Sequence, residues 1–185
     1  MRTWGLFFGT ISVIMADIVM PKIFTSPTHG QMSWDSALAK IVWFMGLDAN
    51  ASYDVIIGTD SEAVNGESDF VSAIIVHKKG RGGVYFWGRQ KISHLNSMKQ
   101  RIWQEATLSL SLAQRVVDDF SKIGLFDSSG NSDNGLNLEI HVDIGPNGKT
   151  RELIADIVGM IRANGFKVAT KPSSWGASHV ADRHV

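Results

Sequence analysis

The chain has 185 residues, of which 44% are hydrophobic and 19% charged, and this composition excludes an intrinsically disordered protein. It contains no cysteine, so disulfides, thiolate zinc sites and a cysteine nucleophile are excluded. Its 18 basic and 18 acidic residues give a net charge of zero, which by itself argues against a nucleic-acid partner.

The N-terminal twenty residues contain one apolar run, Trp4–Met15. This run is too short to span a bilayer, and no clear signal-peptide cleavage site follows it. We therefore expect residues 1–23 to be an N-terminal extension and residues 24–185 to form a single domain. A cytoplasmic protein without membrane contact is expected, and the lack of cysteine fits a reducing compartment.

Helix and strand patterns then follow one another along the first part of the domain. Ser33 is a suitable N-cap for a helix that ends near Gly46. The β-branched run Val55–Ile57 is typical of a buried central strand. Two more strands should flank a hairpin connection at Lys78–Gly83, and a long helix should cover residues 97–120.

The second part of the chain alternates strands and helices. Residues 136–144 alternate apolar and polar side chains, which predicts a strand. An amphipathic helix over 149–164 should end at Gly165, followed by a short strand at 166–170 and a last helix that begins at Ser173 or Ser174. Strands joined by hairpins are antiparallel and strands joined through helices are parallel, so an α/β fold with a mixed sheet is expected.

Four carboxylates lie where a simple core would not place them. Asp60 ends the first buried strand, Asp143 ends the fourth, Glu105 lies on the apolar side of the long helix, and Asp182 lies in the last helix. Converging carboxylates repel one another, and a hard cation such as Mg²⁺ or Mn²⁺ relieves that repulsion. Taken singly, each acid is more often structural, as a turn acid, a loop cap or an exposed helix residue.

The positive charge of the chain is concentrated in two regions. Residues 77–101 carry seven basic residues and no acidic one, and residues 144–185 carry a net charge of +3. The first region is either a phosphate-binding surface, with Lys78 and Arg81 as contacts, or a solvated face that protects an edge strand. In the second, Lys149 and Arg151 are candidate phosphate contacts, with plain surface charge the alternative.

Two histidines lie close to the acids in the sequence. His141 precedes Asp143 by two residues, and His179 lies one helical turn before Asp182. His141 could orient an acid or bind metal, and His179 could carry a proton; a structural role is the alternative for both.

Four segments of the sequence resemble the uncharacterised YkuK-type family of ribonuclease-H-like proteins. These segments are FTSPTHGQMSWDSALAKI, IIGTDSE, HVDIGPNGKTRELIADIVGMI and KPSSWGASHVADR. The resemblance implies a five-stranded mixed sheet in the order 3-2-1-4-5, with strand 2 antiparallel and helices on both faces.

The resemblance also implies a function. It suggests a nuclease that hydrolyses phosphodiester bonds of RNA or DNA with Mg²⁺ or Mn²⁺ in a two-metal-ion mechanism, and a nucleic acid as partner. By position, the catalytic and metal-binding acids would be Asp60, Glu105, Asp143 and Asp182. The alternative is a non-catalytic module that binds nucleic acid or protein and keeps the fold.

Overall fold

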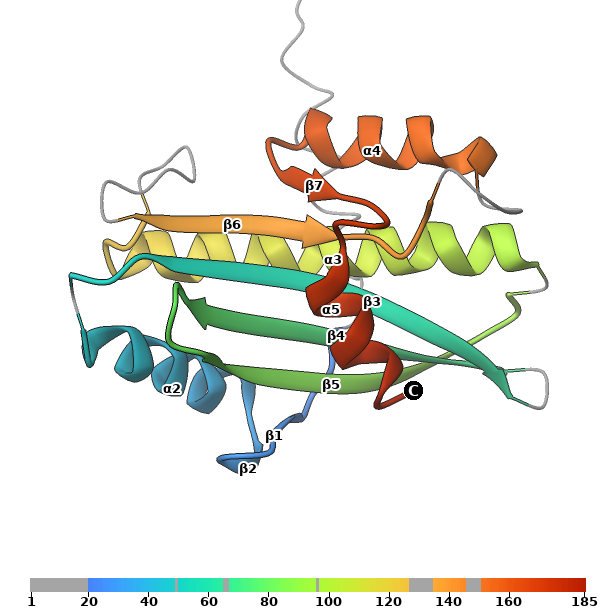
Figure 1. Ribbon diagram of the computed structural model, residues 1–185. Helices are drawn as coiled ribbons and strands as arrows, with labels where there is room; N and C mark the ends of the chain where they lie inside the picture. The colour runs from blue at the N-terminus through green and yellow to red at the C-terminus, as the bar shows by residue number, and fades with distance from the viewer. Residues whose placement is uncertain (1–19, 49, 65–66, 96, 127–134, 146–150) are drawn as a thin grey trace, which may run out of the picture.

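A mixed β-sheet with helices on both faces forms the protein, as the computed structural model shows (Figure 1). The structure describes residues 20–185 except 49, 65–66, 96, 127–134 and 146–150. Its elements in chain order are β1 (Phe24–Ser26), β2 (Gly30–Met32), α2 (Trp34–Gly46), β3 (Tyr53–Val64), β4 (Glu67–Lys78), β5 (Gly83–Ser93), α3 (Met98–Lys122), β6 (Leu136–His141), the 3-10 helix η1 (Arg151–Leu153), α4 (Ile154–Ala163), β7 (Lys167–Ala169) and α5 (Trp175–Asp182).

Within the described residues the sheet has seven strands in the order β2-β1-β5-β4-β3-β6-β7. The last five reproduce the expected order 3-2-1-4-5, with β4 antiparallel to β3 and β5, and with β6 parallel to β3 and β7. The expected total of five strands was wrong. The hairpin of β1 and β2 extends the β5 edge, where Thr25 pairs with Trp87.

Local sequence signals account for the helix boundaries. The backbone N–H of Ser36 donates to the Ser33 hydroxyl at the start of α2, which confirms Ser33 as the N-cap. At the start of α3, Ser97 and Gln100 form a capping box in which each side chain accepts from the other's backbone N–H. Gly165, just after α4, has a φ of 87°, the left-handed backbone conformation expected of a glycine that ends an α-helix.

The two faces of the sheet have cores of different size. Helices α2, α3 and α4 pack one face, where β3 and β6 contribute fully buried residues such as Ile57 and Ile140. On the other face α5 packs through Ala181 against Val71 and Ala73 of β4. Figure 1 shows α3 behind the sheet and α5 in front of it. None of the described helices has both the length and the apolar character needed to cross a membrane.

A polar network joins α2 to α3 at Asp119, whose exposed fraction is 6%. Its carboxylate accepts hydrogen bonds from Trp34 Nε1 at 2.8 Å, Arg115 Nε at 2.6 Å and Lys122 Nζ at 2.7 Å. Burial alone would raise the pKa of Asp119, but these three donors outweigh burial and lower the pKa to about 2. The ionised carboxylate therefore stabilises the contact between the two helices.

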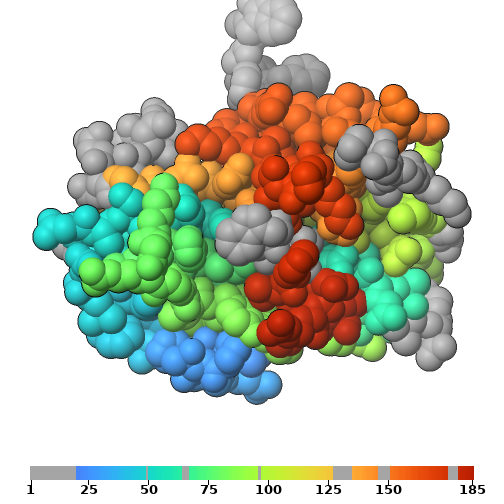
Figure 2. All heavy atoms as spheres, in the orientation of Figure 1, coloured from blue at the N-terminus to red at the C-terminus, as the bar shows by residue number. Residues whose placement is uncertain are grey.

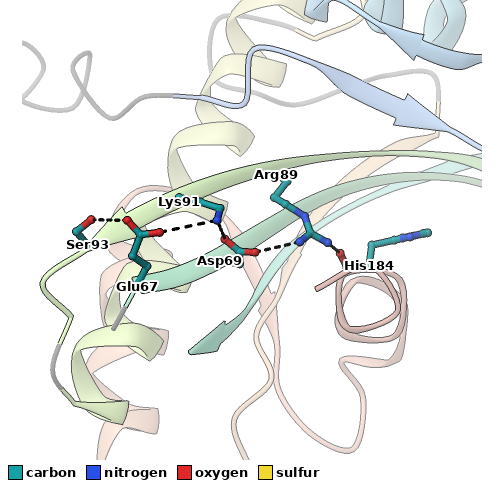
Figure 3. Close-up of polar contacts among 6 residues, drawn as sticks. All are labelled: Glu67, Asp69, Arg89, Lys91, Ser93 and His184. Carbon is teal, nitrogen blue, oxygen red and sulfur yellow. Dashed lines mark hydrogen bonds and ion pairs between the residues drawn. The ribbon is translucent and has the colours of Figure 1, made fainter. Parts of the chain in front are cut away.

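The chain end after α5 is held on β5. The His184 ring stacks on Trp87 with centroids 4.4 Å apart, and its Nε2 lies 3.4 Å from the Tyr85 hydroxyl. Arg89 bridges the Asp69 carboxylate, at 3.0 Å, and the His184 carbonyl oxygen (Figure 3). In Figure 2 the dark red C-terminal residues lie against green β5. Because α5 has only a small core of its own, these contacts help to fix its position.

Asp119→Asn tests the network between α2 and α3. The folded-state pKa lies below the ordinary value of 3.8, so the carboxylate stabilises the fold above pH 4 and this contribution is lost as the pH falls from about 4 to about 2. We expect the variant to lose about 2 kcal/mol of unfolding free energy at pH 7, and the difference to shrink in acid. Urea denaturation at a series of pH values measures it. Asp118→Asn, at an exposed neighbour bonded to Gln114, is the control and should change little.

His184→Ala tests the attachment of the C-terminus. Loss of the ring stack and of the Tyr85 contact should loosen α5, so amide hydrogen exchange in α5 should be faster while exchange in β3 and β6 stays unchanged. We expect a change of roughly 1 kcal/mol in local opening free energy. The control is His179→Ala, at an exposed histidine of α5 itself. Equal exchange in the two variants would contradict the attachment.

Candidate functional site

The parallel pairing of β3 with β6 brings the first two candidate acids close to the carboxyl end of β6. These strands are parallel, with Ile57 opposite Ile140, and Asp60 and Asp143 each follow that pair by three residues. The carboxyl ends of parallel strands are where α/β proteins commonly build their sites. Asp143 follows the end of β6 by two residues, as expected, whereas the expectation that Asp60 ends its strand was wrong: β3 continues past Asp60 to Val64 because it stays paired with β4.

Glu105 approaches from α3 on one face of the sheet. It is only 7% exposed, and its Oε1 accepts a hydrogen bond from the Ser61 hydroxyl at 2.5 Å. Burial raises the pKa of Glu105 to about 8; the charges of Asp60 and Asp143 add to the rise, whereas Ser61 and Arg101 oppose it. At neutral pH the carboxyl group therefore keeps its proton unless a cation comes close.

Asp60 is half-buried, and the charges of other acids affect its pKa. Its pKa is raised to about 6, mainly by burial and also by the negative charges of Asp182 and Asp143, while the Ser61 backbone N–H and the charge of Lys171 lower it. Asp182 itself is exposed, near the end of α5. Asp60 thus interacts electrostatically with each of the other three predicted acids, and Glu105 also interacts with Asp143.

Asp143 has a partner that the sequence did not suggest. Its Oδ2 lies 2.8 Å from Lys171 Nζ, and its side chain is 29% exposed. Lys171 lies in one of the segments that carry the family resemblance, but neither charge patterning nor helix periodicity singled it out. Ser61 was also missed as a site residue. Successive side chains of a strand point to opposite faces, so Ser61 faces α3 and Asp60 faces the other side of the sheet.

The two histidines have different environments. His141 is 4% exposed, its Nε2 lies 3.5 Å from Glu139 Oε2, and burial lowers its pKa although Glu139 acts in the opposite direction. A neutral, buried imidazole fits the structural alternative. His179 is exposed on α5, three residues before Asp182.

Two of the expected phosphate contacts lie far from the acids. Lys78 pairs with Tyr53 at the start of β3, seven residues before Asp60, and its Nζ is 2.6 Å from Asp48 Oδ2. Seven strand residues span about 23 Å. Arg81 belongs to the same hairpin, so the structure does not bring these two residues together with the acids. Arg151 is exposed in η1, and Lys149 lies outside the described residues.

Other cations of the basic region are closer to Asp60. Val71 pairs with Asp60 on one side and with Arg89 on the other, so the three side chains share one face of the sheet. Lys91, two residues further along β5, lies 3.8 Å from Glu67 and from Asp69 (Figure 3). Asp60, Val71 and Arg89 therefore form a row across β3, β4 and β5, and Lys91 lies on the same face next to Arg89.

The described part of the chain contains no group of three or more histidine, aspartate or glutamate side chains arranged to hold a metal ion. Asp60 and Glu105 are nevertheless affected by the charges of neighbouring acids, which change their pKa values.

Comparison with known proteins places the chain in a family. The chain is 29% identical over 170 residues to the uncharacterized protein YkuK of Bacillus subtilis (strain 168), covering 87% of this chain and 95% of that protein. Its structure is weakly similar to RNase H1 from the halophilic archaeon Halobacterium salinarum NRC-1, with a TM-score of 0.34, 13% identity and coverage of 71% of this chain and 99% of that one.

A second solved structure is similar at the same low level. It is the N-terminal RNase H domain of rv2228c from Mycobacterium tuberculosis, fused to maltose binding protein, with a TM-score of 0.32, 12% identity and coverage of 71% of this chain and 93% of that one. Neither score is high enough to support an argument, so the assignment depends on the sequence. Residues 36–185 match the family model described as ribonuclease H-like, and the chain therefore belongs to the ribonuclease H-like family.

Proposed function

We propose that this protein is a divalent-metal-dependent nuclease that hydrolyses phosphodiester bonds of RNA or DNA. The observation that carries the proposal is the electrostatic coupling of Asp60, on the central strand β3, to acids of α3, α5 and the segment after β6. Burial and mutual repulsion raise the pKa of Asp60 to about 6 and that of Glu105 to about 8. Keeping such groups close together lowers the stability of the fold, and such unfavourable arrangements are typical of functional sites.

The donor set fits Mg²⁺ or Mn²⁺ in its chemistry. Carboxylate oxygens are the ligands that hard cations prefer, and a cation would remove the repulsion that raises these pKa values. The geometry fits less well, because no three of the described histidine, aspartate or glutamate side chains are arranged to hold an ion. Side-chain movement is therefore part of the proposal, and the Asp143 contact with Lys171 is the first that must change.

The proposed roles follow from position. Asp60 and Asp143 would be the principal ligands, with Glu105 and Asp182 completing the site. Bound divalent ions in such sites activate a water and stabilise the leaving oxygen. The Ser61 hydroxyl, which donates to Glu105, holds that carboxyl group in a single orientation.

For the substrate, the face of the sheet beside Asp60 offers the guanidinium of Arg89 and the ammonium of Lys91 to a phosphate backbone. Arg151 and Lys149 remain proposed phosphate contacts, and His179 a proposed proton carrier on α5. Arg89 is held between Asp69 and the His184 carbonyl, so Lys91, with its longer ion pairs, is the more available of the two.

A second candidate is a non-catalytic module that binds nucleic acid or protein. The observation in its favour is the lack of a preformed three-ligand group among the described residues. In this case the acids would be remnants of a site, and the cations of the same face would bind the partner without cleavage.

Cleavage by the wild type and by Asp60→Asn tests the enzymatic proposal. With Mn²⁺ and a panel of single-stranded RNA, DNA and RNA–DNA hybrid, we expect cleavage by the wild type and at least a hundredfold loss in the variant, because the neutral amide is a poor ligand. Asp54→Asn is the matched control: it lies on the same face of β3 at the far end, paired with Lys79. Cleavage that survives Asp60→Asn would sink the assignment.

Metal-dependent thermal stability separates the two candidates without relying on activity. If the acids bind Mn²⁺, millimolar metal should raise the melting temperature of the wild type by several degrees, since a ligand that binds only the folded state stabilises it. The increase should disappear in Asp60→Asn and persist in Asp54→Asn. A wild type whose melting temperature does not respond to Mn²⁺ would favour the non-catalytic module.

A further inference from the structure

Lys171 is placed beside the acids by the backbone of the sheet. The pairing of β6 with β7 continues past both strands, because the N–H of Val142 donates to Ala169 O at 3.0 Å and the N–H of Lys171 donates to Ile144 O at 2.9 Å. Lys171 is therefore fixed next to the segment that contains Asp143. The position of its ammonium group is a consequence of strand register.

A glycine makes room for this lysine. A Cβ atom at Gly145 would lie 3.1 Å from Lys171 Cβ, which is tighter than ordinary contacts. The side chain of Lys171 passes over Gly145, and its Nζ reaches Asp143 Oδ2 at 2.8 Å. The backbone and the neighbouring residue both direct the ammonium group to the carboxylate.

The contact is poorly explained as a stabilising ion pair. The Lys171 side chain is 55% exposed, and solvent weakens the attraction between such partners. Its charge also acts on Asp60, whose pKa it lowers against the effects of burial and of the other acids. Lys171 thus supplies positive charge to the acidic site as a whole, from a side chain with room to move.

We propose that the Lys171 ammonium is a built-in counter-charge that occupies Asp143 until a divalent cation binds and then moves to a phosphate oxygen of the substrate. This inference depends on the proposed metal-dependent function. Lys171 would then set metal affinity and couple it to substrate binding.

Calorimetric titration of MnCl₂ into the full-length, EDTA-treated protein tests the proposal without any measurement of cleavage. In Lys171→Met the competitor for Asp143 is gone, so Mn²⁺ should bind about fivefold more tightly, the factor that corresponds to loss of one exposed ion pair of about 1 kcal/mol. Lys171→Gln should behave in the same way and guards against misfolding of the first variant. Lys171→Arg keeps the charge and should bind Mn²⁺ about as the wild type does.

Lys167→Met is the matched control, because Lys167 is an exposed lysine of β7 whose ammonium donates to Asn137 instead of to an acid. Its Mn²⁺ affinity should equal that of the wild type. Unchanged or weaker Mn²⁺ binding in Lys171→Met and Lys171→Gln overturns the inference while leaving the proposed function intact. Absence of Mn²⁺ binding in the wild type and in every variant overturns both.

Discussion

The parallel pairing of β3 with β6 is the constraint on which the candidate site depends. Its register, with Ile57 opposite Ile140, brings Asp60 and Asp143 close to the carboxyl end of β6. Both isoleucines are fully buried, so a slip of either strand by one residue would turn its isoleucine out of the main core and its acid to the opposite face. Packing in the main core therefore determines the relative position of two carboxylates that repel each other.

The same core supports the other unfavourable feature of the site, the burial of Glu105. Its helix α3 is held along its length by apolar contacts with the sheet and near its C-terminus by the Asp119 network with α2. The free energy of these contacts offsets the cost of a buried carboxyl group, to which Ser61 donates a hydrogen bond. The stable contacts of α3 with the sheet and with α2 therefore offset the repulsion among the acids and the cost of burying Glu105.

Much of this arrangement could be predicted from the sequence, because its signals are local. Capping residues and apolar periodicity marked the helices, and the order of elements led to the correct arrangement of β3 to β7. β1 and β2 were missed because Phe24–Ser26 and Gly30–Met32 each contain a single apolar residue and show no alternation. Lys171 was missed because its contact with Asp143 arises from the pairing of β6 with β7, which no local pattern encodes. The phosphate contacts at Lys78 and Arg81 were expected near the acids because charge density along the chain does not tell one end of a hairpin from the other.

The zero net charge of the chain also has a structural meaning. Cations of the basic region 77–101 pair with acids of the neighbouring regions, as Lys78 does with Asp48, Arg89 with Asp69 and Lys99 with Glu152. A phosphate backbone at this surface must therefore compete with carboxylates, and each such exchange adds little net attraction. The exchange at Asp143 would instead favour substrate binding: a divalent cation that displaces Lys171 from Asp143 would free its ammonium group to bind the substrate. In the proposed nuclease, nucleic-acid affinity would therefore arise mainly at the site after metal binds, and the surface charge would contribute mainly to the direction in which the strand lies.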